Sequence, residues 1–185
     1  MICRYTIARI ERMNVVITAT EYRSSQVYFT EKKPNTHIAN STFNRITYST
    51  NDFIMNGVYI QFELYVKQIE QNFNSNIYNL HFDPHHEHNH RMIEIFNDIE
   101  VGILDKWLRL EHPMVETHDH DHHDHHDHDK REYINDIHQQ LQSGVISVWK
   151  NEMRQYEKPQ FQHFIIKISG VWDNERGCGL TFKFI

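Results

Sequence analysis

The chain has 185 residues, of which 39% are hydrophobic and 12% aromatic, and its formal net charge is −6 with histidine neutral. This length and composition exclude wholesale disorder and are typical of one domain, residues 1–185, with a core of its own. Five acidic residues lie between positions 119 and 129, so the rest of the chain is close to balanced, and the net charge neither supports nor excludes a polyanionic partner.

The first third of the chain has the patterns of short strands. β-rich runs lie at residues 2–8, 13–20, 27–30 and 43–50. The clearest strand is 58–66, because apolar residues from Val58 to Val66 alternate with polar residues and tyrosines. Asn56-Gly57 directly before it is a turn signal, which predicts a hairpin within residues 52–66.

Histidines gather just before the next predicted element. His86, His88 and His90 occupy alternate positions, with Glu87 and Asn89 between them. They lack the His-Glu-x-x-His order of metalloproteases, but alternate imidazoles could chelate a metal from an extended chain. Two interpretations stay open: a solvated loop, or part of a metal site shared with the longer histidine run described below.

The strongest helix pattern covers residues 91–111. Apolar residues recur there at three- and four-residue steps and form one stripe, made of Met92, Phe96, Ile99, Ile103, Trp107 and Leu110. Asn89 is the predicted N-cap, and Pro113 ends the helix because proline disfavours helical geometry in the residue before it.

Residues 117–130 form a low-complexity run of histidine and aspartate. The run contains no apolar residue that would anchor it to a core, so we expect a disordered loop inserted in the domain. Imidazole and carboxylate are ligands for Zn and Ni. The predicted ligands are His118, His120, His122, His123, His125, His126 and His128, together with His86, His88 and His90. A passive surface loop is the alternative, and no cofactor is required in either case.

The C-terminal third predicts a short helix and three strands. Residues 133–141 fit a helix that ends near Gly144, residues 145–149 fit a strand, and 163–169 with 180–185 form a terminal hairpin. The sum is an α+β fold of mostly antiparallel strands, an OB-like or related barrel or sandwich, with one long amphipathic helix.

The segments 164–172 and 177–184 also carry a resemblance. Phe-Ile-Ile-Lys-Ile-Ser-Gly-Val-Trp runs into Gly-Cys-Gly-Leu-Thr-Phe-Lys-Phe, after a tyrosine-bearing strand, a helix and a Leu-x-x-Gly passage at 141–144. This order resembles the single-stranded-DNA-binding proteins of large eukaryotic DNA viruses over about the C-terminal two thirds of the chain. The chain departs from that pattern by carrying the histidine run. The resemblance implies an OB-like barrel that binds single strands without sequence preference, in a virion or host cell.

Aromatic and basic residues on the predicted strands are the candidate binding residues, because aromatic rings stack on bases and cations contact phosphates. They are Tyr59, Tyr65, Lys67, Trp149, Lys150, Lys167, Trp172 and Lys183. The alternative for each tyrosine and tryptophan is an ordinary half-buried place in a strand.

Several function classes find no support in the sequence. There is no GxGxxG, P-loop or GxSxG motif and no nucleophile with a recognisable base, so we expect no enzyme. Two cysteines are too few for a disulfide framework, and no signal peptide or membrane-length apolar run occurs, which predicts an intracellular protein of the cytosol or nucleus.

Three functions remain open. They are single-stranded nucleic-acid binding, metal binding or pH response through the histidines, and a structural or interaction role, as in a virion, with self-association through strand edges as a homo-oligomer. We place nucleic-acid binding first because it uses more of the folded chain.

Overall fold

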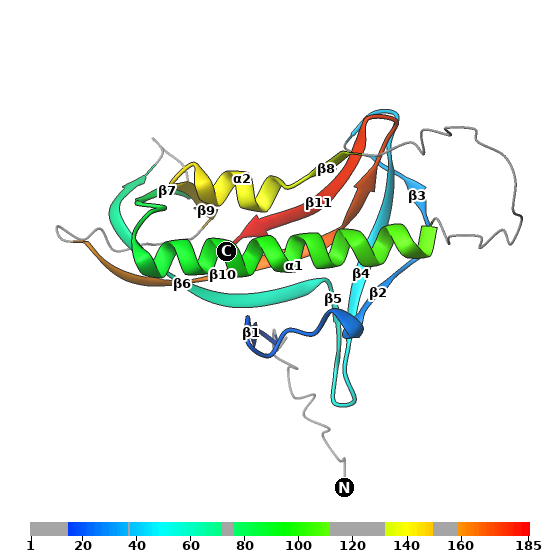
Figure 1. The fold of residues 1–185 in the computed structure, drawn as a ribbon, viewed down its shortest axis with the longest axis horizontal. Helices are drawn as coiled ribbons and strands as arrows, with labels where there is room; N and C mark the ends of the chain where they lie inside the picture. Colours follow the sequence, from blue (N-terminus) through cyan, green and yellow to red (C-terminus); the bar gives the residue numbers. More distant parts are fainter. Residues whose placement is uncertain (1–14, 37, 72–75, 112–131, 150–158) are drawn as a thin grey trace, which may run out of the picture.

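The computed structural model describes residues 15–36, 38–71, 76–111, 132–149 and 159–185 (Figure 1). The elements are β1 (Ile17–Thr18), η1 (Ser24–Gln26), β2 (Val27–Phe29), β3 (Lys33–Pro34), β4 (Thr42–Ser49), β5 (Ile54–Asn56), β6 (Val58–Gln71), β7 (Ile77–Phe82), α1 (Glu87–Glu111), β8 (Glu132–Ile134), α2 (Asp136–Gln142), β9 (Val145–Trp149), β10 (Gln160–Asp173) and β11 (Gly177–Phe184). The predicted mixed α+β fold is confirmed. It is a five-stranded barrel with extra strands and two α-helices.

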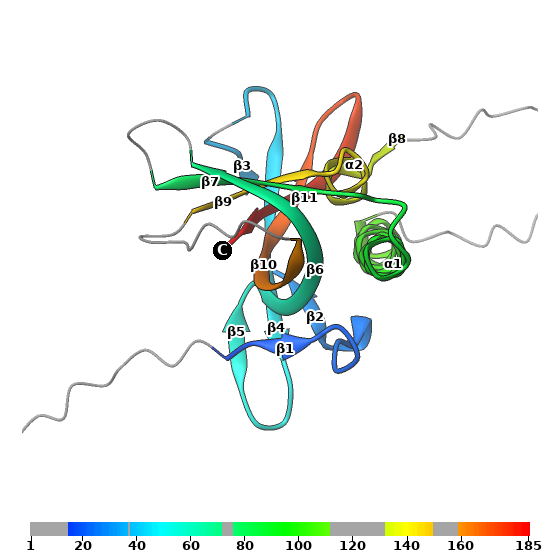
Figure 2. The ribbon, with the colours of Figure 1, turned by 90° about the vertical axis from the view of Figure 1, so that its left-hand side faces the viewer.

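The barrel closes in the order β6-β7-β9-β11-β10 and back to β6 (Figure 2). Neighbouring strands are antiparallel except β9 and β11, which run parallel. β6 closes the ring because it pairs with β10 from Val58 to Val66 and with β7 from Val66 to Gln71. A register shift between Val66 and Gln68 bends the strand between these two partners. Apolar residues alternate toward the interior, so the residues between them face outward.

β10 continues beyond the barrel and joins a second group of strands. Its register with β11 shifts between Ile168 and Gly170, and from Gly170 to Asp173 it pairs with β4. Only glycine fits at this junction, because a Cβ at Gly170 would overlap the Phe43 ring and the carbonyl oxygen of Asn44. β2, β3 and β5 in turn pair with β4, while β1 lies along β6 and β8 along β11.

Helix α1 runs along the length of the molecule and packs against the barrel (Figure 1). Its buried apolar residues are Ile93, Phe96, Ile99, Ile103, Leu104 and Trp107. Phe96 meets Phe62 of β6 edge-on, with ring centroids 5.0 Å apart. The helix prediction is confirmed, although the helix begins at Glu87 and Leu110, predicted for the stripe, is exposed. Within the described ranges, neither α-helix carries an apolar segment of membrane-spanning length.

Asn89 has a different role from the predicted N-cap. It lies inside α1 with no exposed surface, and its side chain bonds to the backbone of Tyr65 in β6. The amide oxygen accepts from the Tyr65 N–H at 2.7 Å, and the amide nitrogen donates to the Tyr65 carbonyl at 3.0 Å. The side chain therefore supplies the two hydrogen bonds that a neighbouring strand would supply.

Glu100 joins α1 to α2 from inside the protein. Its two carboxylate oxygens accept hydrogen bonds from the N–H groups of Ile137 and His138, at 3.1 and 3.0 Å, in the first turn of α2. Glu100 is fully buried, and burial raises the pKa of its carboxyl to about 7. The carboxyl satisfies helix-end donors that would otherwise be orphaned in the core.

Two strand predictions need correction. The hairpin predicted within 52–66 is wrong, because β5 pairs with β4 and the chain reverses between Thr50 and Phe53. Gly57 is required for its backbone instead: its φ is +90°, and a Cβ there would lie 2.7 Å from the Ile168 carbonyl oxygen. Of the predicted strand 13–20, the structure contains the short β1, while 2–8 and the disordered loop predicted at 117–130 lie outside the described residues.

Candidate nucleic-acid interface

Three of the predicted binding residues form one rung on the outside of the barrel. Tyr59 of β6 is opposite Lys167 of β10, which is opposite Lys183 of β11. The residues on either side of each are more deeply packed, so these three side chains share the outer face. The Lys167 ammonium lies 5.1 Å from the centroid of the Tyr59 ring, a cation–π contact.

Trp149 lies on a fourth strand, two residues along from this rung, because the parallel register of β9 and β11 places Ser147 level with Lys183 and Trp149 level with Ile185. Val148 of β9 pairs with Phe184 of β11 and both are buried, so Trp149 and Lys183, which adjoin them, point outward. Trp149 is 60% exposed, an unusual position for so large a ring. We call Tyr59, Lys167, Lys183 and Trp149 the outer row; its strands are neighbours around the barrel (Figure 2).

The outer row has unneutralised positive charge. Within the described part of the chain, neither Lys167 nor Lys183 has a carboxylate within ion-pair distance. Glu63, which shares the outer face of β6 with Tyr59, contacts histidines instead: His163 Nε2 lies 3.3 Å from one carboxylate oxygen and His88 Nε2 lies 3.8 Å from the other. The row thus combines two rings and two available cations.

Tyr65 belongs to a second group of rings farther along β6. It stacks on His86 with centroids 4.5 Å apart and planes 14° from parallel, and Phe161 of β10 packs edge-on to it at 5.1 Å. Phe161 is 47% exposed. Phe161 was not among the predicted binding residues, although positions 161, 163, 165 and 167 alternate with more deeply packed ones, a pattern that predicts an outward face.

The remaining predicted residues do not join the outer row. Lys67 is exposed but pairs with Asp83, its ammonium 3.0 Å from the carboxylate. Trp172 is 9% exposed and lies over Gly179, where an added Cβ would be 2.8 Å from the indole. Lys150 lies outside the described residues.

Three of the predicted metal ligands lie within the described residues, and the other seven do not. His88 also bonds through Nε2 to the Glu63 carbonyl oxygen at 3.1 Å, His86 packs on Tyr65, and His90 is exposed on α1. Over the ranges that the structure describes, no group of three His, Cys, Asp or Glu residues is arranged to hold a metal ion. The seven histidines from His118 to His128 lie outside these ranges, so metal binding by them stays a prediction.

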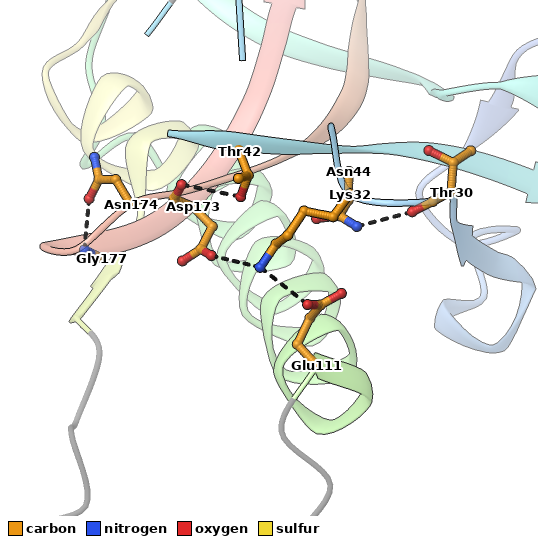
Figure 3. Close-up of polar contacts among 8 residues, drawn as sticks. All are labelled: Thr30, Lys32, Thr42, Asn44, Glu111, Asp173, Asn174 and Gly177. Atoms are coloured by element: carbon orange, nitrogen blue, oxygen red, sulfur yellow. Dashed lines mark hydrogen bonds and ion pairs between the residues drawn. The ribbon is translucent and has the colours of Figure 1, made fainter. Parts of the chain in front are cut away.

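A polar network lies where β3, β10 and α1 meet (Figure 3). The Lys32 ammonium is 3.0 Å from the Asp173 carboxylate, 3.2 Å from that of Glu111 and 5.4 Å from the Trp107 ring centroid. Partial burial lowers the pKa of Lys32, but hydrogen bonds to Asp173 and Glu111 outweigh it and raise the pKa above its ordinary value. We call Lys32, Asp173, Glu111 and Trp107 the Lys32 network.

A cleft of about 470 Å³ opens beside the Lys32 network. It is lined by Lys32, Pro34, Asn35, Asn40, Ser41, Thr42, Asp173, Asn174 and Glu175. The one cation in this lining is already paired with two carboxylates, and Glu175 adds a further acidic side chain. The cleft therefore offers little attraction to a phosphate group.

Comparison of the chain with protein-family models, curated proteins and solved structures gave no match.

Proposed function

We propose that the protein is a non-enzymatic binder of single-stranded nucleic acid, which contacts the strand through the outer row. The observation that carries this proposal is the Tyr59–Lys167–Lys183 rung with the exposed Trp149 on an adjacent strand. Rings and cations in one row are what a single strand requires, because bases stack on aromatic faces and phosphates attract ammonium groups.

The fold supports the proposal. A small closed barrel of five strands is compatible with an OB-like fold, whose outer face and loops are used for oligonucleotides. The outer row offers rings for stacking and ammonium groups for phosphates, so we expect tolerance of sequence rather than recognition of one. Stacking and phosphate contacts are available on every single strand, whatever its bases.

A direct binding assay tests the proposal. The full chain is titrated into fluorescently labelled oligo(dT) at low salt, and anisotropy reports the affinity. Trp149→Ala should weaken binding by ~1–3 kcal/mol, the contribution of one stacked base. The matched control is Tyr28→Ala, since Tyr28 is 55% exposed but lies on β2, outside the outer row. Absence of binding to oligo(dT) at low salt, or equal losses in the two variants, refutes the proposal.

A further inference from the structure

The rings around Phe161 lie on the same outer face as the outer row, at the other end of the paired part of β10. Phe161 and Lys167 are six residues apart, and alternate residues of a strand share a face. At about 3.3 Å per residue, the two side chains are separated by about 20 Å along the strand. Tyr65, opposite Phe161, is likewise six residues from Tyr59 in β6.

Phe161 is held in place despite its exposure. Its ring makes edge contacts with Tyr65, His88 and His86, at centroid distances of 5.1, 5.0 and 6.5 Å. Tyr65 is in turn fixed from two sides, because its ring stacks on His86 and its backbone bonds to Asn89. A ring that is ordered before binding loses little conformational entropy when a ligand stacks on it.

We infer that Phe161, supported by Tyr65 and His86, is a second base-stacking site for the same single strand. This inference rests on the proposed function. The bound nucleic acid then follows the outer face of β10 from Lys167 to Phe161. At the ~3.4 Å per nucleotide of a stacked strand, 20 Å spans about six nucleotides. That length lies within the ~4–16 nucleotides that single OB-type barrels cover.

Glu63 lies on this path, and its charge predicts the direction in which a substitution should change the affinity. It is the one carboxylate among the described outward residues of β6 and β10 between Tyr59 and Lys167 at one end and Tyr65 and Phe161 at the other. His88 and His163 face it from α1 and β10. Its negative charge repels a phosphate backbone, so its removal should strengthen binding of a strand that passes over it.

Oligomers of two lengths separate the second site from the first. Labelled dT4 and dT10 are titrated with the wild-type chain, Phe161→Ala, Glu63→Gln and the Tyr28→Ala control, and thermal unfolding confirms that each variant is folded. Phe161→Ala should weaken dT10 binding about 5- to 140-fold, equivalent to ~1–3 kcal/mol for a stacked base, and change dT4 binding little. Glu63→Gln should raise the affinity for dT10 and leave dT4 unchanged.

The outcomes discriminate between the two claims. If the wild-type chain binds dT10 and Phe161→Ala binds it equally well, the second site is rejected while the proposed function stands. Equal losses for dT4 and dT10 reject the second site as well, because Phe161 would then belong to one short site. If the wild-type chain binds neither oligomer, the proposed function itself fails.

Discussion

The outer row and the Lys32 network contain the same kinds of side chain on or beside β10, yet the structure uses them in opposite ways. In the outer row, Lys167 lies over an aromatic ring at the surface with no carboxylate beside it in the described residues. In the network, Lys32 is paired with Asp173 and Glu111 and lies against the Trp107 ring. The difference teaches that a lysine and an aromatic ring are available to a ligand only where no further layer covers the sheet.

The largest expected effect contrasts two tryptophans. Trp172→Ala removes a buried indole from the β10–β4 junction and should lower the free energy of unfolding by ~3–5 kcal/mol, while the folded variant still binds oligo(dT). Trp149→Ala should change stability by less than ~0.5 kcal/mol because the ring is exposed. Urea denaturation of both variants measures this. A Trp149 variant as unstable as the Trp172 variant would break the distinction between the two regions.

A smaller effect concerns a carboxyl in the interior. Burial raises the pKa of Glu100 from 4.5 to about 7, so the folded state binds more protons than the unfolded state between these values. Stability contributed at this position is therefore fully present below pH ~4.5 and falls as pH rises to about 7, by on the order of 3 kcal/mol. Surface carboxyls should show no such dependence.

The measurement for Glu100 compares unfolding free energies of wild type and Glu100→Gln across pH 4.5–7. The advantage of the wild type over the variant should shrink as pH rises, because the variant cannot titrate at this position. Glu94→Gln, an exposed position of the same helix, is the control. A difference that stays constant with pH would mean that the carboxyl is ionised throughout.

The smallest effect sharpens the role of the outer row. The two lysines of the outer row should contribute about −1.4 to the slope of log affinity against log salt for single-stranded nucleic acid, or −0.7 per lysine. Lys167→Ala and Lys183→Ala should each flatten the slope by about 0.7, and Lys67→Ala, whose ammonium already pairs with Asp83, should leave it unchanged. Anisotropy titrations at several salt concentrations give these slopes. If Lys67→Ala flattened the slope as much as Lys167→Ala does, the nucleic acid would bind at a different surface.

Local periodicity predicted the elements that depend on one face being buried. The strand 58–66, the helix over 91–111 and the terminal hairpin all follow from alternation or helical spacing, and the structure contains each of them. The same alternation placed Tyr59, Lys167 and Lys183 outward. That Tyr59 lies opposite Lys167 was not predictable, because this register joins residues more than 100 positions apart in the chain.

Sequence patterns did not predict the positions whose contacts come from other segments of the chain. Trp172 and Trp149 look alike as strand residues, but Trp172 packs over Gly179 and is 9% exposed, whereas Trp149 is 60% exposed. Asn56-Gly57 is typical of a hairpin turn, whereas Gly57 is needed for a positive φ and a close approach to β10. Phe161 was overlooked because the rings that support it, Tyr65 and His86, come from other parts of the chain.

Asn89 has one more consequence, for the behaviour of the protein at high concentration. A strand edge with free N–H and C=O groups is a template on which another chain can pair. At Tyr65 both backbone groups are occupied by a single amide from the neighbouring helix. That stretch of β6 is closed to intermolecular strand addition, so self-association by strand pairing would have to use a different edge.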